Sequence, residues 1–336
     1  MTGANGTNNT TNTQGPTSDM FPSALGWAIT YAVLAVAVVL GNSLTIAAFS
    51  INRKLAHART NYFVVSLGIA DFMVGACSIP MYAAELMFNH FHKGKRSSLF
   101  HAIYLPVDAF MGFASVFTLV AIALDRACSV LYPHKHKTIS KTAYLCAIAL
   151  VWFHAACVAA LHLLSNFTSG VLPIEVFNYA VIVGIFISLI TISLAYASVW
   201  HRVRNPPKLH HRDTTMQEKK LAVTLSMITF VFVLTWVPFY VLNIFSMFCL
   251  SCYVLELVYF AKFLHYSNSF ANFIIYALKI PKFRRTVFQI LCGKREGTKR
   301  PKERPIKLPA ENKNLSVKDI EIELNSEAND EARPDQ

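Results

Sequence analysis

The sequence predicts an all-α membrane protein: a seven-transmembrane helix bundle followed by a short amphipathic cytoplasmic eighth helix. Seven long apolar stretches run through the 336 residues, of which 54% are hydrophobic and only 15% charged. A helix needs about 20 apolar residues to cross a hydrocarbon layer roughly 30 Å thick, and each stretch is long enough. We expect the spans near 24–50, 61–87, 98–130, 141–164, 174–202, 217–248 and 253–279.

The distribution of basic residues predicts the orientation. Much of the net charge of +12 comes from loops that follow the first, third, fifth and seventh spans. The loops on the opposite side carry only Lys93, Lys95 and Arg96. By the positive-inside rule, the N-terminus is extracellular and the C-terminus cytoplasmic, in a multi-pass protein of the plasma membrane. A charge placed in this way indicates a lipid membrane and argues against a nucleic acid as partner.

The segments outside the transmembrane domain, 24–279, are expected to differ in character. Residues 1–23 are rich in Asn, Thr and Gly, and we predict a disordered extracellular segment. Residues 281–292 form the amphipathic eighth helix, and 293–336 a disordered cytoplasmic tail. Glycosylation sequons on the predicted outer side are centred on Asn5, Asn8, Asn9 and Asn166.

The cysteines divide by their predicted location. Cys249 and Cys252 lie in a short outer loop, where the oxidising exterior permits a disulfide. Cys292 follows the amphipathic stretch and is a candidate for palmitoylation, with a plain surface thiol as the alternative. We expect three of the thiols within the spans, Cys77, Cys146 and Cys157, to be small buried apolar groups.

The third and sixth spans each present a functional side chain near the predicted outer end and an ionic side chain near the predicted inner end. Asp108 and Arg126 are separated by 18 residues, which is five whole turns, so they share one helix face about 27 Å apart. Glu218 and Trp236 repeat this separation in the sixth span. An Arg126–Glu218 ion pair could therefore hold the inner ends of two helices together. The alternative is that both side chains extend to the interface.

A deeply placed carboxylate predicts a polar core. Asp71 lies within the second span, where a charge costs about 2.5–3.5 kcal/mol. Four other positions supply oxygen atoms: Ser115, Asn268, Ser269 and Asn272. Oxygen ligands around one carboxylate suit a small cation such as Na⁺, and a water-filled hydrogen-bond network is the alternative. Allosteric Na⁺ is the only cofactor that the sequence suggests.

Proline and aromatic residues mark a candidate ligand site in the sixth span. Pro238 removes a backbone hydrogen bond and is expected to kink the helix. Trp236 precedes it, and Phe239 and Tyr240 follow it. A kink beside an acidic cavity favours binding of a ligand as much as simple core packing.

The ordered set of these motifs resembles the rhodopsin-like (class A) G-protein-coupled receptors over roughly Leu40 to Cys292. The residues that carry it are Gly41-Asn42, Ser66-Leu67-Gly68-Ile69-Ala70-Asp71, Asp125-Arg126, Trp152, Tyr196, Phe232 to Phe239, and Asn268 to Tyr276. The resemblance implies ligand sensing outside and activation of a heterotrimeric G protein inside. It also implies switch roles for Asp125, Arg126, Tyr196, Glu218, Pro238 and Tyr276. Arrestin and a receptor kinase would be further partners.

The sequence departs from the family pattern at several positions. Ala127 replaces the tyrosine that usually follows Arg126, and Phe273 stands where proline is expected in the seventh span. His101 occupies the place of the usual disulfide cysteine at the top of the third span. The first two departures put the strength of switching in doubt, so that the chain could signal constitutively or poorly.

Within the family, two subgroups share features with this chain. The second and third spans and the Cys249/Cys252 pair resemble adenosine receptors, and Asn243 matches their adenine-binding asparagine. Their span-seven histidine is replaced here by Tyr266, and the serine before it by His265. Asp108 with Tyr266 instead resembles amine receptors, where a carboxylate pairs with a ligand ammonium.

Lys262 offers a competing partner for Asp108. It lies four residues before Tyr266, on the same helix face, and a Lys262–Asp108 pair would weaken the amine hypothesis. The sequence thus slightly favours a receptor for a small amine-like cation, with an adenosine or nucleoside receptor as the alternative. The transporter hypothesis is distant, since no related halves are visible, and the lack of a nucleophile–base constellation argues against an enzyme.

Overall fold

The computed structural model describes residues 20–52, 61–91, 98–167, 173–205, 227, 230–245, 249 and 254–293. Every element of regular secondary structure within these ranges is a helix, as predicted. The helices are α1 (Met20–Ile51), α3 (Asn61–Met73), the π-helix η1 (Val74–Ser78), α4 (Ile79–Phe91), α5 (Ser98–Leu131), α6 (Pro133–Thr138), α7 (Lys141–Phe167), α8 (Ile174–Arg204), α10 (Leu255–Lys279) and α11 (Pro281–Leu291). A further apolar helix spans Phe230–Phe245.

Six of the expected spans coincide with these helices to within a few residues, because long runs of apolar side chains favour helix and proline marks several boundaries. The helix Phe230–Phe245 lies within the sixth expected span. Pro133 and Pro281 open α6 and α11, where a missing amide proton costs nothing. α8 begins near Glu175 and ends with Arg202 and Arg204, in accord with the helix dipole. Residues 217–226 of the predicted sixth span lie outside the described ranges.

By length and composition alone, five of the described helices could cross a membrane: Ala24–Ile51, Asn61–Phe91, Leu99–Leu131, Lys141–Asn166 and Ile174–Arg204. The Phe230–Phe245 helix is apolar but shorter. α10 is not among the five, and several of its polar residues are buried in the bundle, including His265, Asn268 and Asn272.

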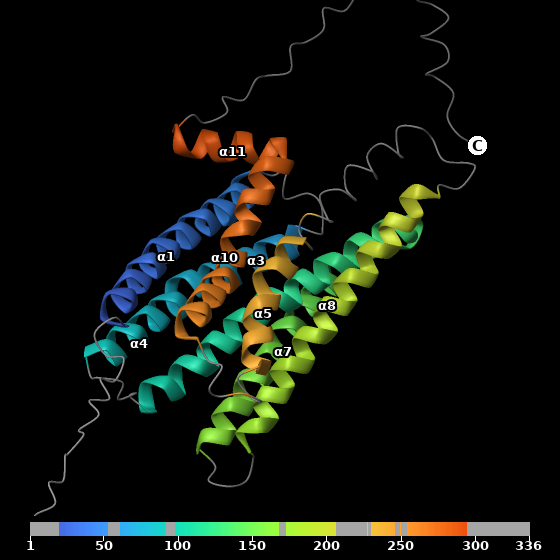
Figure 1. Ribbon diagram of the computed structural model, residues 1–336. Helices are drawn as coiled ribbons and strands as arrows, with labels where there is room; N and C mark the ends of the chain where they lie inside the picture. Colours follow the sequence, from blue (N-terminus) through green and yellow to red (C-terminus); the bar gives the residue numbers. More distant parts are fainter. Residues whose placement is uncertain are drawn as a thin grey trace, which may run out of the picture. The chain divides into compact units, whose positions relative to one another are not determined.

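α5 occupies the centre of the bundle, packing against α3, α7 and α8, while α1 packs against α3, α4 and α10 (Figure 1). α11 contacts both α1 and α10. The main core cluster joins α3, α5, α7, α8 and the Phe230–Phe245 helix around residues such as Leu67, Val116, Ile192 and Phe232. A separate cluster around Phe49, Tyr276 and Phe283 anchors α11.

The second span is interrupted by the π-helix η1, which the sequence did not predict. Gly75 in η1 lies so close to α1 that an added Cβ would be 2.8 Å from Cγ1 of Val38. Glycine is therefore needed for this close approach. The π-turn begins three residues after Asp71 and shifts the register of α4 relative to α3.

The outward faces of α7 and α8 are strongly apolar, with exposed side chains such as Leu150, Phe153 and Ile187. This pattern fits helices in contact with lipid. The expectation that the span thiols are buried was wrong for Cys146 and Cys157, which are exposed on α7, while Cys77 is half-buried. A thiol behaves as a small apolar group, so it can face lipid as well as a protein core. The apolar residues around these cysteines therefore did not imply that the thiols are buried inside the bundle.

Candidate functional site

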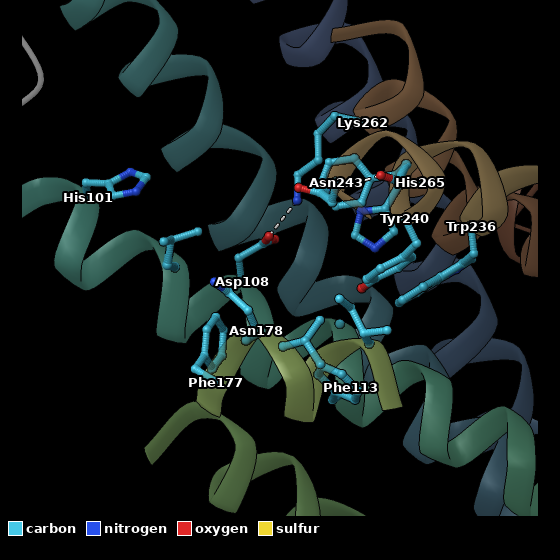
Figure 2. A pocket seen from close by; sticks show the side chains of 16 residues that line it. His101, Asp108, Phe113, Phe177, Asn178, Trp236, Tyr240, Asn243, Lys262 and His265 are labelled. Carbon is cyan, nitrogen blue, oxygen red and sulfur yellow. Dashed lines mark hydrogen bonds and ion pairs between the residues drawn. The ribbon is translucent and has the colours of Figure 1, made fainter. Parts of the chain in front are cut away.

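A cavity of about 310 Å³ lies among α5, α8, α10 and the Phe230–Phe245 helix. Its volume is in the range of small-molecule pockets, roughly 300–1,000 Å³. Figure 2 shows side chains from these four helices converging on it. Most of the predicted ligand-binding residues line it: Asp108, Trp236, Phe239, Tyr240, Asn243, Lys262 and His265. Tyr266 does not line the cavity, but its hydroxyl donates a hydrogen bond to Asp108.

Asp108 on α5 is bound to Lys262 on α10. The Lys262 ammonium lies 2.7 Å from Oδ2 of Asp108 (Figure 2), and Lys262 is only 4% exposed. The Tyr266 hydroxyl donates to Oδ1 at 2.9 Å, and the Tyr104 hydroxyl donates to Oδ2 at 3.3 Å. The internal pair that competes with an amine ligand is thus the one that forms in the structure.

Aromatic rings surround the Lys262 ammonium. Its Nζ atom lies 4.5 Å from the ring centre of Phe239, 4.6 Å from that of Tyr266 and 5.8 Å from that of Tyr82. Each ring presents its electron-rich face to a cation within about 6 Å. Lys262 therefore has both a carboxylate partner and an aromatic enclosure.

Stacked aromatic groups form the wall of the cavity on the Phe230–Phe245 helix. Trp236 stacks on Tyr240 at 5.6 Å and meets His265 edge-on at 4.3 Å, while His265 stacks on Phe239 at 5.1 Å. Nε1 of Trp236 and Nδ1 of His265 are buried without a hydrogen-bond partner among the described residues. Because buried polar atoms are normally paired, these two atoms are an unsatisfied feature of the side chains that line the cavity.

Asn243 lies at the exposed rim of the same cavity. Its side-chain amide donates to the backbone oxygen of Phe239 at 2.7 Å, one turn earlier in the helix. This bond fixes the orientation of the amide.

Asp71 is fully buried in a polar core below the cavity. It accepts hydrogen bonds from the Ser115 hydroxyl at 2.7 Å and the Asn272 amide at 2.8 Å. Thr235 connects to Asn268 at 3.4 Å, and Asn42 donates to the backbone oxygen of Ser269 at 3.1 Å. The structure therefore brings Ser115 and Asn272 to Asp71, whereas the hydrogen bond given for Asn268 is to Thr235.

The donor set around Asp71 fits a small hard cation, since it combines one carboxylate with hydroxyl and amide groups. No cluster of three or more His, Cys, Asp or Glu side chains that could hold a metal occurs in the part of the chain that the structure describes. A cation here would depend on a single charged ligand and neutral oxygen atoms.

The C-terminal end of α5 carries a second bonded carboxylate; we call it the inner end because the sequence predicts that it faces the cytoplasm, and the opposite end the outer end. Asp125 accepts from Arg126 at 2.8 Å, from Tyr144 of α7 at 2.7 Å, and lies 2.9 Å from Nε2 of His136 in α6. Arg126 is thus bonded to its own neighbour. Its predicted partner Glu218 lies outside the described residues, so the Arg126–Glu218 pair stays a prediction.

Three other predicted switch residues lie within described helices. Tyr196 and Tyr276 are both buried, each 8% exposed. Pro238 lies within the Phe230–Phe245 helix, two residues after Trp236.

Several contacts were not predicted from the sequence. Tyr104 bonds to Asp108 one turn away, a spacing that could have revealed it. His101, in place of the family cysteine, lies 2.7 Å from Glu85 and so joins α5 to α4 by a polar contact. His136 and Tyr144 offered no periodic or motif signal.

The predicted modification sites are only partly within the described ranges. Asn166 is exposed at the end of α7, as a glycan acceptor must be, and Cys292 is an exposed free thiol after α11. Cys249 is disulfide-bonded. Cys252, Asn5, Asn8 and Asn9 lie outside the described residues, so the Cys249–Cys252 pairing and these glycan sites stay predictions.

Comparison with known proteins supports the resemblance. The family described as 7 transmembrane receptor (rhodopsin family) matches residues 41–276. The adenosine receptors A2a of dog (Canis lupus familiaris), human (Homo sapiens) and horse (Equus caballus) are each 29% identical over 297 residues, covering 77% of this chain and 70% of the relative.

These findings confirm the predicted seven-transmembrane fold, the likeness to adenosine receptors and the assignment as a receptor rather than an enzyme. The chain belongs to the rhodopsin family of seven-transmembrane, G-protein-coupled receptors, which are multi-pass proteins of the plasma membrane.

Proposed function

We propose that this receptor binds a small, uncharged, nucleoside-like molecule from the extracellular side and activates a heterotrimeric G protein on the cytoplasmic side. The observation that carries the proposal is the cavity in which Asp108 is already neutralised by Lys262. A ligand without a positive charge needs no free carboxylate. It needs aromatic surfaces and hydrogen-bonding groups, which this cavity supplies.

The lining suits a planar, polar ring system. Phe239, Tyr240 and Trp236 line the cavity and offer aromatic faces. Asn243 lies at the rim, at the position that matches the adenine-binding asparagine of adenosine receptors. The similarity to proteins named adenosine receptor A2a supports the same class of ligand.

An amine ligand is the second candidate, because Asp108 and Tyr266 occupy the positions that bind amines in related receptors. Such a ligand would have to displace Lys262 from a contact of 2.7 Å in a site where Lys262 is 4% exposed. This contact supports a nucleoside-like ligand over the amine that the sequence alone slightly favours.

The remaining roles follow from the two ends of the bundle. Arg126, Tyr196 and Tyr276 would act as switch residues on the cytoplasmic side, where a G protein would bind. Arrestin would compete for the same surface. The polar core at Asp71 would bind allosteric Na⁺. The N-terminus would be extracellular and the C-terminus cytoplasmic, with Cys292 available for palmitoylation.

A paired ligand screen tests the proposal. Cells that express the parent receptor, Asn243→Ala and Asp108→Asn are tested against nucleosides and biogenic amines with a G-protein reporter and with radioligand binding. We expect a nucleoside response that Asn243→Ala weakens at least about tenfold, the effect of one lost hydrogen bond in a binding site. Ser267→Ala is the control, since this serine bonds to the Phe263 backbone and is not among the lining residues.

The opposite pattern would overturn the proposal. If the parent responds to a biogenic amine and not to nucleosides, and Asp108→Asn abolishes that response, the amine candidate is correct and the nucleoside proposal fails.

A further inference from the structure

The surroundings of the Lys262 ammonium are those of a binding site for an ammonium ion. One carboxylate oxygen of Asp108 lies 2.7 Å away, and three aromatic rings, those of Phe239, Tyr266 and Tyr82, lie within 5.8 Å. Two tyrosine hydroxyls hold the carboxylate in place, from Tyr266 and Tyr104. The occupant of this site belongs to the receptor itself.

We propose that Lys262 is a built-in ammonium that fills the cation site of Asp108 and sets the specificity of the cavity. While Lys262 is in place, small primary amines are excluded. When its charge is removed, the same site accepts a free primary ammonium ion. The inference rests on the proposed ligand cavity, but it concerns the charge that this cavity accepts.

Two physical effects make the exclusion strong. Lys262 is tethered to α10, so it competes with a free amine at a high effective concentration. A second cation beside it would be repelled by a like charge in a poorly solvated site and would have only one carboxylate to share. A free amine must therefore displace the lysine side chain completely.

Removing the lysine amine should allow a free amine to bind to Asp108. In Lys262→Met, the side chain keeps most of its length and apolar stem but loses its charge. Asp108 keeps its hydroxyl partners, Tyr266 at 2.9 Å and Tyr104 at 3.3 Å, and lacks a cation. The aromatic rings remain in place around the vacated position. n-Butylammonium is a suitable probe because its ammonium group can replace that of Lys262 while its four-carbon chain lies in the adjoining cavity.

The test measures the thermal unfolding midpoint of purified, detergent-solubilised receptor as n-butylammonium chloride is added, with sodium chloride at equal ionic strength as the reference. We expect Lys262→Met to be stabilised saturably, at a concentration at least about tenfold lower than any effect on the parent. Lys262→Arg should behave like the parent. The double variant Asp108→Asn/Lys262→Met should lose the effect, because its site carries no charge.

Saturable stabilisation of Lys262→Met but not of the double variant supports the proposal. A folded Lys262→Met receptor that gains nothing from n-butylammonium overturns it, and so does an equal gain in the double variant. If Lys262→Met fails to fold, the probe is added throughout expression and purification. Recovery of folded receptor then supports the proposal, and failure to recover while the double variant folds overturns it.

This measurement needs no agonist and no G protein. A nucleoside screen that finds no ligand would leave its outcome unaffected. A failed butylammonium titration would likewise leave the nucleoside proposal standing. The two failures are therefore distinguishable.

Discussion

Both ends of α5 carry a carboxylate bound to a cation, but the two pairs are built differently. Asp108 binds Lys262, which lies 154 positions away in the sequence on another helix, α10. Asp125 binds Arg126, its immediate neighbour. The outer ion pair therefore joins two helices, whereas the inner one neutralises a charge within a single helix.

Between them lies a third buried carboxylate with a different kind of partner. Asp71 is bonded to the neutral donors Ser115 and Asn272, and no basic side chain among the described residues pairs with it. We therefore expect the outer pair to contribute most to stability. The inner pair should restrain signalling, and the central carboxylate should make the receptor sensitive to ions.

The largest expected effect is on stability at the outer pair. Either Asp108→Asn or Lys262→Met leaves one buried charged group without its ion-pair partner, which costs about 3–5 kcal/mol. The double variant removes both charges and should recover most of that loss, because the two costs are coupled rather than additive. Thermal unfolding midpoints of the purified parent, single and double variants measure this. Additive losses in the double variant would show that the pair does not join the helices.

The next effect is on signalling at the inner pair. Asp125→Asn removes the charge that holds Arg126 and weakens the contacts to His136 and Tyr144. We expect basal, ligand-independent nucleotide exchange on a reconstituted G protein to rise about tenfold, as for the loss of one charge-assisted hydrogen bond. The thermal midpoint should fall less than in Asp108→Asn. An unchanged basal rate would show that Asp125 does not restrain Arg126.

The helices were predictable from the sequence because a membrane span needs a long apolar run, and such runs are visible locally. The Asp108–Lys262 contact was predictable only as one of two alternatives. The spacing of Lys262 and Tyr266 places them on one face of α10, but it does not decide whether Asp108 meets a lysine or a ligand.

Other contacts had no local signal. His136 and Tyr144 reach Asp125 from α6 and α7, 11 and 19 residues later, through the path of the connecting segment. The π-helix η1 depends on the close approach of Gly75 to Val38 on another helix. Both features arise from tertiary packing, which the periodicity of the sequence does not predict.

A smaller effect is expected at the central carboxylate. Since Asp71 has neutral partners only among the residues described, Na⁺ can supply the missing positive charge, and it should stabilise the parent receptor relative to choline at equal ionic strength. At a Na⁺ concentration ten times the dissociation constant the gain is about 1.4 kcal/mol. Asp71→Asn should abolish this dependence of the thermal midpoint, while Asp108→Asn should retain it. Equal Na⁺ dependence in Asp71→Asn and the parent would exclude Asp71 as a ligand.

The smallest expected effect concerns Tyr144 of α7 and His136 of α6, which both contact Asp125. Tyr144→Phe removes only the hydroxyl that donates to Asp125 at 2.7 Å and leaves the ring in contact with Phe63, at a centroid distance of 5.3 Å. The loss of one hydrogen bond corresponds to about 1 kcal/mol, so basal nucleotide exchange should rise a few-fold, less than in Asp125→Asn. His136→Ala removes a further partner of Asp125, at 2.9 Å, and serves as the comparison. If Tyr144→Phe raised the basal rate as much as Asp125→Asn does, the hydroxyl of α7, and not the adjacent arginine, would be the main restraint on this carboxylate. The inner end would then resemble the outer one, with its essential contact made between helices.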